Sequence, residues 1–254
     1  MNLVSLDPTE NQSSEALRSF LEKCQEPARR FHRQQLVSIS LEVDSLDPLA
    51  VLASIFESDE RHFYVERPAD HLAIAGAEAV LEFTCSGPSR FEECQAFVDD
   101  VLANAIIVGD QGVPFAGPHF FTAFSFFDEV PSDLAFPSAS IFVPRWQVAT
   151  KGKRTVAVAN LLIDEDTDVA AVAEKVWRAH SKFGEFSYAE KMFTAEGESP
   201  RITMSEVSSP EHYRESVQRM VERIGAGEFD KIVLARAKDL VADQEMDPLR
   251  ALDG

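Results

Sequence analysis

Cysteine is scarce in this sequence, which holds three among its 254 residues: Cys24, Cys85 and Cys94. Their number and spacing fit neither a disulfide framework nor a zinc site, both of which need more cysteines or closer pairs. We therefore expect these residues to be buried or partly buried free thiols in a reducing compartment.

Long apolar runs are also missing, and none approaches the roughly 20 residues that cross a bilayer as a helix. The first segment, Met1–Ala16, is polar and acidic. It therefore lacks the basic and apolar pattern of a signal or transit peptide. We expect a cytoplasmic protein that does not have a membrane as a partner.

Basic residues are in deficit: Lys and Arg total 24 against 43 Asp and Glu, and the formal net charge is −19. Nucleic acids and anionic membranes attract Lys and Arg, so this acidity argues against both as partners. An anionic small molecule would be repelled at long range as well. Its binding site would need local cations.

Common catalytic and phosphate-binding motifs are absent too. Gly225–Gly227 lacks the third glycine and the preceding strand of a dinucleotide-binding loop, and no Gly-x-Ser-x-Gly elbow occurs. The acidic segment Asp164–Asp168 is interpreted as the solvated start of a helix, where the helix dipole favours carboxylates. The sequence therefore offers no metal ligands of its own.

What the sequence does contain is regular periodicity in an ordinary globular composition, 45% hydrophobic and 26% charged. Apolar–polar alternation predicts strands over residues 35–43, 62–67, 139–148 and 155–163. Residues 72–84 are apolar and rich in alanine, and they are interpreted as two strands around a bend, with a helix over part of them as the alternative. Helical spacing predicts helices over residues 11–33, 47–56, 89–107, 169–177 and 208–225. Residues 181–206 show few repeats and are interpreted as a connector.

The stretch after the last of these helices carries the candidate chemistry. Ser208 and Glu211 fit a capping box at the helix start, and Lys231–Leu240 is predicted to be a strand that begins with a lysine. If small apolar neighbours desolvate Lys231, its pKa falls, which makes a general base available near neutral pH. A solvated surface charge is the alternative, because lysine is almost never fully buried.

The residues Phe229–Arg236, which follow a helix and a Gly-x-Gly turn, resemble the lysine-containing strand of isochorismate synthases, members of the chorismate-utilising enzymes. Gly117–Asp128 resembles a family strand that usually reads Gly-Gly-Phe-x-Phe-Asp, with Thr122 and Ala123 in place of the two glycines. Phe136–Arg145 resembles the next family landmark. The resemblance spans most of the chain, from about Leu36 to Asp247, and is sharpest from Glu211 to Lys238.

The resemblance implies an α/β (α+β) fold with large, mainly antiparallel sheets flanked by helices. It also implies Mg²⁺-dependent conversion of chorismate to isochorismate, in which water adds at C2 and the C4 hydroxyl leaves. Such enzymes supply precursors of menaquinone, phylloquinone or siderophores. Lys231 would be the general base that activates water, since relatives that use ammonia usually have glutamine there. The full-length enzyme is expected to be a monomer.

By the same resemblance, residues 1–205 are the amino-terminal region and residues 206–254 begin the chorismate-binding catalytic region. The general acid and the Mg²⁺ ligands belong to motifs expected further downstream, so none is assigned here. We expect this chain, as the amino-terminal part of the enzyme, to be inactive alone. A salicylate synthase sharing the lysine, a non-catalytic partner-binding module and a plain α/β scaffold with a fortuitous motif remain alternatives.

Overall fold

The computed structural model describes residues 2–3, 13–55, 60–131, 133, 136–185, 200–246 and 248–253. The chain divides into two compact units, Met1–Met192 and Phe193–Gly254. The first unit contains most of the regular structure. The second contains Lys231 and is described with the candidate site.

The first unit is built on one large sheet of eight strands, counted over the described residues. Its strands are β1 (Asn2–Leu3), β2 (Gln35–Val43), β3 (His62–Arg67), β4 (Leu72–Cys85), β5 (Ile106–Gly109), β6 (Phe121–Phe124), β7 (Ala139–Lys151) and β8 (Arg154–Ile163). Its helices are α1 (Ser14–Phe31), α2 (Pro48–Ile55), the short 3-10 helix η1 (Pro68–Asp70), α3 (Arg90–Asn104) and α4 (Val169–Glu185).

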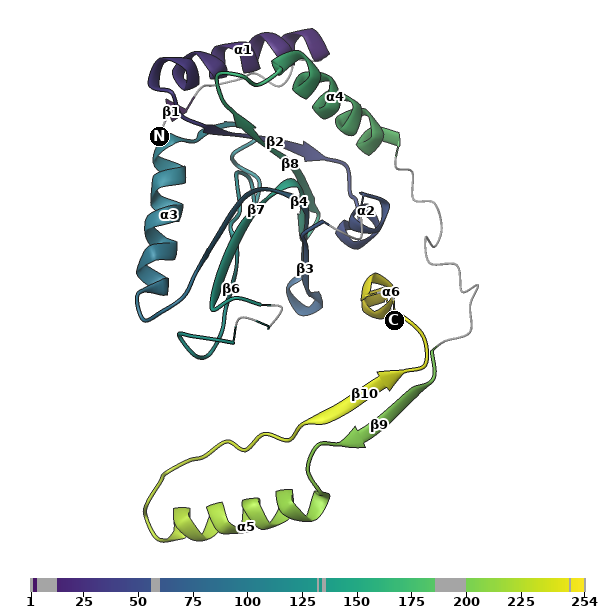
Figure 1. Ribbon diagram of the computed structural model, residues 1–254. Helices are drawn as coiled ribbons and strands as arrows, with labels where there is room; N and C mark the ends of the chain where they lie inside the picture. Colours follow the sequence, from purple (N-terminus) through teal and green to yellow (C-terminus); the bar gives the residue numbers. More distant parts are fainter. Residues whose placement is uncertain are drawn as a thin grey trace. The chain divides into compact units, whose positions relative to one another are not determined.

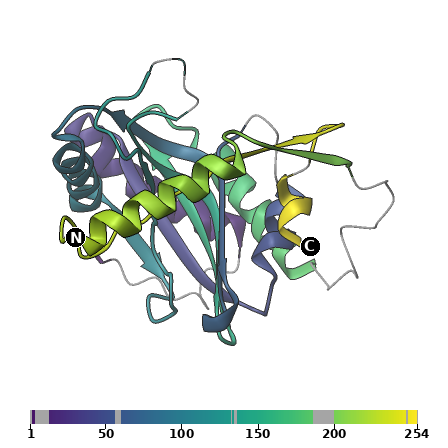
Figure 2. The same ribbon diagram turned by 90° about the horizontal axis from the view of Figure 1, so that it is seen from below.

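The strands follow the order β1-β5-β2-β8-β7-β4-β3, and β6 pairs with β7 off this path (Figure 1). The pairs that involve β5 are parallel. All other pairs of this sheet are antiparallel. The predicted mixed α/β fold with a large, mainly antiparallel sheet flanked by helices is therefore confirmed. Figure 2 shows the sheet and its helices from below.

Helices α1 and α4 lie side by side over one face of this sheet (Figure 1). The Ser13 side chain caps α1 by accepting the N–H of Ala16 at 3.1 Å. Their core cluster joins residues of α1 (Phe20, Leu21, Cys24), of α4 (Val169, Ala173, Val176) and of the strands (Val37, Leu161, Ile163). The apolar residues at helical spacing in α1 are thus the surface that packs on the sheet.

Helix α3 packs on the other face of the sheet. Its Val101 packs near Leu36 of β2, and Leu36 points to the face opposite that of Val37 because side chains alternate along a strand. The helix predicted over residues 89–107 was too long, since α3 ends at Asn104. Residues 106–109 form β5 instead, which lies between β1 and β2. These apolar residues gain backbone partners and burial in the sheet that a longer helix would not give them.

Strand β4 corrects the prediction of two strands around a bend in residues 72–84. It is one continuous strand, Leu72–Cys85, whose register against β7 shifts between Ala79 and Leu81. Glu78 just before the shift has a φ of 58°, the left-handed conformation that favours glycine. A β-bulge therefore produces the bend without ending the strand.

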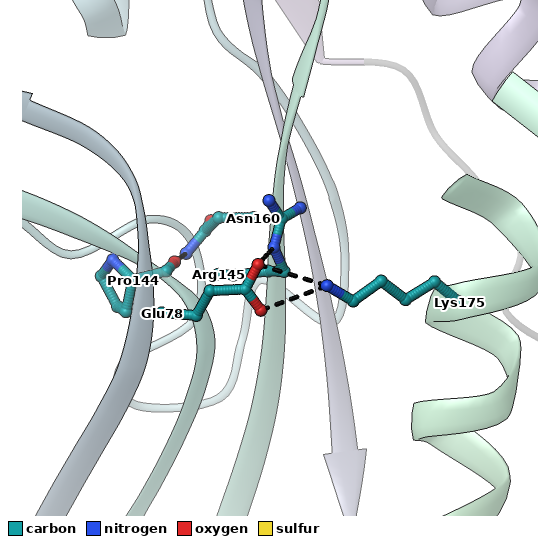
Figure 3. Close-up of polar contacts among 5 residues, drawn as sticks. All are labelled: Glu78, Pro144, Arg145, Asn160 and Lys175. Atoms are coloured by element: carbon teal, nitrogen blue, oxygen red, sulfur yellow. Dashed lines mark hydrogen bonds and ion pairs between the residues drawn. The ribbon is translucent and has the colours of Figure 1, made fainter. Parts of the chain in front are cut away.

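Three side chains hold this bulge (Figure 3). The Glu78 carboxylate pairs with the Arg145 guanidinium of β7 and accepts from Lys175 Nζ of α4 at 3.2 and 3.3 Å. Next to this triad, the buried Asn160 of β8 donates from Nδ2 to the Pro144 carbonyl at 2.8 Å. The strained backbone at Glu78 is thus offset by an ion pair that links two strands and a helix.

The unequal exposure of the two cations leads to a prediction. The Arg145 side chain is 25% exposed and the Lys175 side chain 58% exposed. We expect Arg145→Met to lower the free energy of unfolding by about 1–2 kcal/mol. The control Lys175→Met should cost less than about 0.5 kcal/mol, since solvent screens its pair. Urea unfolding of the two variants measures both values, and equal losses would contradict this assignment.

A second prediction concerns Gly109, which ends β5 with a φ of 90°. A Cβ atom there would lie 1.9 Å from the Ser40 carbonyl oxygen of β2. We expect Gly109→Ala to destabilise the protein by about 3 kcal/mol or more, through strain and collision together. Gly87 is a matched control, because its φ is 95° and a Cβ there meets nothing within 4 Å. Gly87→Ala should cost only about 1–2 kcal/mol, and a similar loss in both variants would refute the collision.

Candidate functional site

The second unit contains Lys231 and is built from a short two-stranded sheet and two helices. Its elements are β9 (Ile202–Glu206), α5 (Pro210–Gly225), β10 (Lys238–Ala242) and α6 (Pro248–Asp253). Strands β9 and β10 pair antiparallel. The predicted connector over residues 181–206 was therefore wrong at both ends, since residues 181–185 belong to α4 and Ile202–Glu206 is a strand. Residues 186–199 lie outside the described part.

Helix α5 leads toward Lys231, and its N-cap lies one residue later than predicted. Ser209, not Ser208, is the N-cap, and its side chain accepts the His212 N–H at 3.2 Å. Pro210 then occupies the first turn, where its missing N–H costs nothing. The predicted helix is confirmed, and the cap moves because only Ser209 is placed to bond the third following residue.

A tight turn follows α5 and directs the chain into Lys231–Lys238, here called the lysine segment. Gly227 has a φ of 76° and donates its N–H to the Ile224 carbonyl at 2.9 Å. Arg223 then pairs with Glu228 at 2.7 Å, and its guanidinium lies 4.7 Å from the centre of the Phe229 ring. The residues just before Lys231 are therefore anchored to the end of the helix.

The strand predicted over Lys231–Leu240 is present only in its last part. Strand β10 begins at Lys238, and residues 231–237 are not part of a strand. A strand needs a partner, and the five residues of β9 pair only with Lys238–Ala242. The Val207 N–H still reaches the Ala237 carbonyl at 3.3 Å, but the chain then turns into α5. Alternation along a strand thus does not set the direction of the Lys231 side chain in this unit.

Two of the three cations in the lysine segment form ion pairs with a carboxylate, and Lys231 does not among the residues that the structure describes. Glu206 pairs with Arg236 at 3.0 Å and with Lys238 at 3.3 Å. Lys231 is exposed, and no hydrogen bond or ion pair reaches it from any residue that the structure describes. The apolar cover that would desolvate its amine is therefore not supplied within this unit. Its role as a general base stays a prediction.

Sequence reasoning missed Glu206, which neutralises the two other cations of the segment. Its strand was detectable, because Ile202 and Met204 alternate with Thr203 and Ser205. The register places Met204 opposite Leu240, and both side chains are exposed. One face of the two-stranded sheet therefore exposes these apolar side chains next to the Glu206–Lys238 pair.

The upstream landmark Gly117–Asp128 lies in the first unit, where it forms a shorter strand than expected, β6. The Gly117 N–H donates to the buried Ser40 hydroxyl at 2.8 Å. Nδ1 of His119 lies 3.2 Å from the Gly117 carbonyl oxygen and 3.1 Å from Gln147 Nε2. Burial lowers the pKa of His119, an effect that the Gly117 carbonyl partly opposes. The landmark thus packs onto β2 and β7.

No three His, Cys, Asp or Glu side chains gather as a metal site within the described ranges. We therefore assign no Mg²⁺ ligand to any of these residues. Among the same residues, no helix is long and apolar enough to cross a membrane.

The environment of His119 gives a pH prediction. Because its pKa is lower in the folded state, the unfolded chain takes up a proton first as the pH falls. Stability should decrease from about pH 7.5 to about pH 5.5, and His119→Gln should reduce that decrease. Urea midpoints at the two pH values measure it, with the exposed His212 as the control in His212→Gln. An unchanged pH dependence in His119→Gln would contradict the prediction.

Comparison with known proteins is consistent with the landmarks. The chain is 26% identical over 233 residues to a protein named "Salicylate biosynthesis isochorismate synthase" of Pseudomonas aeruginosa, covering 90% of this chain and 46% of that protein. It thus spans about half the length of this curated relative. The menaquinone-specific isochorismate synthase from Escherichia coli matches 91% of this chain and 47% of its own, with TM-score 0.49 and 16% identity. The family described as "Chorismate binding enzyme" matches residues 19–254, so the chain belongs to the chorismate-binding enzymes.

Proposed function

We propose that this chain carries the water-activating lysine of an isochorismate synthase. The observation that supports the proposal is Lys231 within Phe229–Arg236, a motif inside the region that the family matches. Relatives that use ammonia usually have glutamine at this point of the motif. A lysine therefore favours water as the nucleophile over ammonia.

In the proposed reaction, chorismate and isochorismate are isomers, because one water enters and one leaves. The neutral amine of Lys231 accepts a proton from water while the water oxygen bonds to C2. The ring double bonds shift, the bond from C4 to its hydroxyl oxygen breaks, and the leaving hydroxyl needs a proton from an acid. That acid is a glutamic acid by family resemblance, and we assign it to no residue of this chain.

A neutral Lys231 requires an environment drier than the one this unit provides. The neighbouring Val233 side chain is 81% exposed and Ile232 36% exposed. In a protein of the relatives' length, further chain that covers these side chains would desolvate the amine and favour its neutral form. The exposed apolar neighbours of Lys231 are thus consistent with a site completed by additional residues.

Binding of the dianionic chorismate by a chain with a net charge of −19 requires local cations. We propose Mg²⁺ as the cofactor that neutralises a substrate carboxylate. This part of the proposal rests on family resemblance alone. No step of the mechanism above depends on it.

A salicylate synthase is the alternative with the same first step, and the name of the Pseudomonas aeruginosa relative also refers to salicylate biosynthesis. Such an enzyme would go on to eliminate pyruvate from isochorismate. Chromatography of the products formed from chorismate separates the two, because only the salicylate synthase releases pyruvate. A non-catalytic partner-binding module would form neither product.

The test of Lys231 is a substitution in a protein of the relatives' length that contains this chain. We expect Lys231→Gln to lower kcat for isochorismate formation by a factor on the order of 10²–10⁴, the usual effect of losing a general base. The fall should appear mainly in kcat, since the proton moves in the transition state. Melting temperature should not change.

The matched control is Lys238→Gln in the same segment. Lys238 begins β10 and pairs with Glu206, so its loss should leave turnover close to that of the unmodified protein. Similar small effects at both lysines would identify Lys231 as an ordinary surface charge. Near-normal turnover in Lys231→Gln with an unchanged melting temperature would remove it from the mechanism.

A further inference from the structure

Two of the three cysteines lie in contact in the first unit. Cys85 is the last residue of β4, and Cys94 lies in the first half of α3. Their Sγ atoms are 3.7 Å apart, which is van der Waals contact between sulfur atoms. Both residues are free thiols. The fold thus places a dithiol at the junction of a strand and a helix.

The backbone on both sides of this dithiol is well anchored. Cys85 pairs with Ala139 of β7 in the antiparallel register. Cys94 is 4% exposed, and it packs in a cluster with Ala139 and Ile141. Between the cysteines, the Gly87 N–H donates to the Asp128 carbonyl at 2.7 Å. These contacts keep the two sulfur atoms together.

The accessibility of the two sulfurs differs. Cys85 is only partly buried, and its thiol donates to the Arg90 carbonyl oxygen, with 3.5 Å between the sulfur and the oxygen. Cys94 is buried. Its burial, and to a smaller extent its contact with Cys85, raises its pKa to about 11. A reagent from solvent therefore reaches Cys85 first, whereas Cys94 meets mainly the sulfur of Cys85.

We propose that Cys85 and Cys94 form a reversible disulfide when the protein meets a small-molecule disulfide. The Cys85 thiolate attacks one sulfur of the reagent, which forms a mixed disulfide and releases one small thiol. The Cys94 thiolate then attacks the Cys85 sulfur and releases the second small thiol. The two cysteines lose two protons and two electrons, and the reagent disulfide is reduced to two thiols.

The geometry makes this bond accessible without unfolding. A disulfide has an S–S length of about 2.05 Å, so the sulfur atoms must approach by roughly 1.6 Å from van der Waals contact. Rotation about the side-chain bonds moves a sulfur atom by such a distance while the backbone stays in place. The product links the end of β4 to α3.

Cys24 provides the internal control. It is 3% exposed within the core formed by α1, α4 and the sheet, and burial raises its pKa to about 12. It packs on the sheet face opposite to the one that α3 covers. Cys24 is therefore expected to stay reduced while the other two cysteines react.

The experiment treats the purified 254-residue chain with oxidised glutathione, followed by thiol counting under denaturing conditions and peptide mapping by mass spectrometry. We expect three thiols to fall to one, a crosslinked Cys85–Cys94 peptide lacking two hydrogen atoms, and reversal by dithiothreitol. Crosslinking should be faster at about pH 9 than at about pH 7, because thiolates are the attacking species. The oxidised form should melt at a higher temperature, since the bond constrains the unfolded chain.

Variants separate the steps. Cys24→Ser should crosslink at the rate of the unmodified protein. Cys94→Ser should retain glutathione on Cys85, because no second thiol displaces it. A stable glutathione adduct on Cys85 of the unmodified protein, or a crosslink through Cys24 or between two chains, would overturn the proposal. The peptide map of the unmodified protein decides this even if Cys94→Ser does not fold.

Discussion

The backbone pairing of β7 is the constraint on which the first unit depends. This strand pairs with β4 along nearly its whole length, with β8 through a hairpin, and with β6 at its start. Its side chains enter core clusters on both faces of the sheet. Where β4 bulges, Glu78 keeps the pairing intact by binding Arg145 of β7. The helices can cover the sheet because this central strand is continuous.

Local patterns predicted the elements that their own residues determine. Strands β2 and β3 were predicted with the bounds they have, since alternation and a following proline mark them clearly. The bulge at Glu78 was not predicted, because it depends on a register against β7 that no local pattern contains. The predicted start of a strand at Lys231 was wrong for a related reason. A β-prone run becomes a strand only where a partner strand lies beside it.

The candidate site was predictable to a smaller extent than the fold. The motif around Lys231 identified the family, and the match over residues 19–254 confirms it. What a lysine can do chemically depends on its cover and its charged neighbours, and these come from residues distant in sequence. Glu206 shows this, since it binds Arg236 and Lys238 from β9, a strand some 30 residues earlier in the chain. Lys231 as a general base therefore stays a prediction.

The parallel pairing of β5 with β2 has a consequence for the entropy cost of folding. Val37 pairs with Ile106, so the loop that this contact closes contains the strands β3 and β4, the helices α2 and α3 and the 3-10 helix η1. The β7–β8 hairpin, by contrast, joins Lys151 to Arg154 and needs only a short loop. Distant contacts carry the larger loop-closure cost. Closing the pair between β2 and β5 therefore costs more chain entropy than closing the hairpin between β7 and β8.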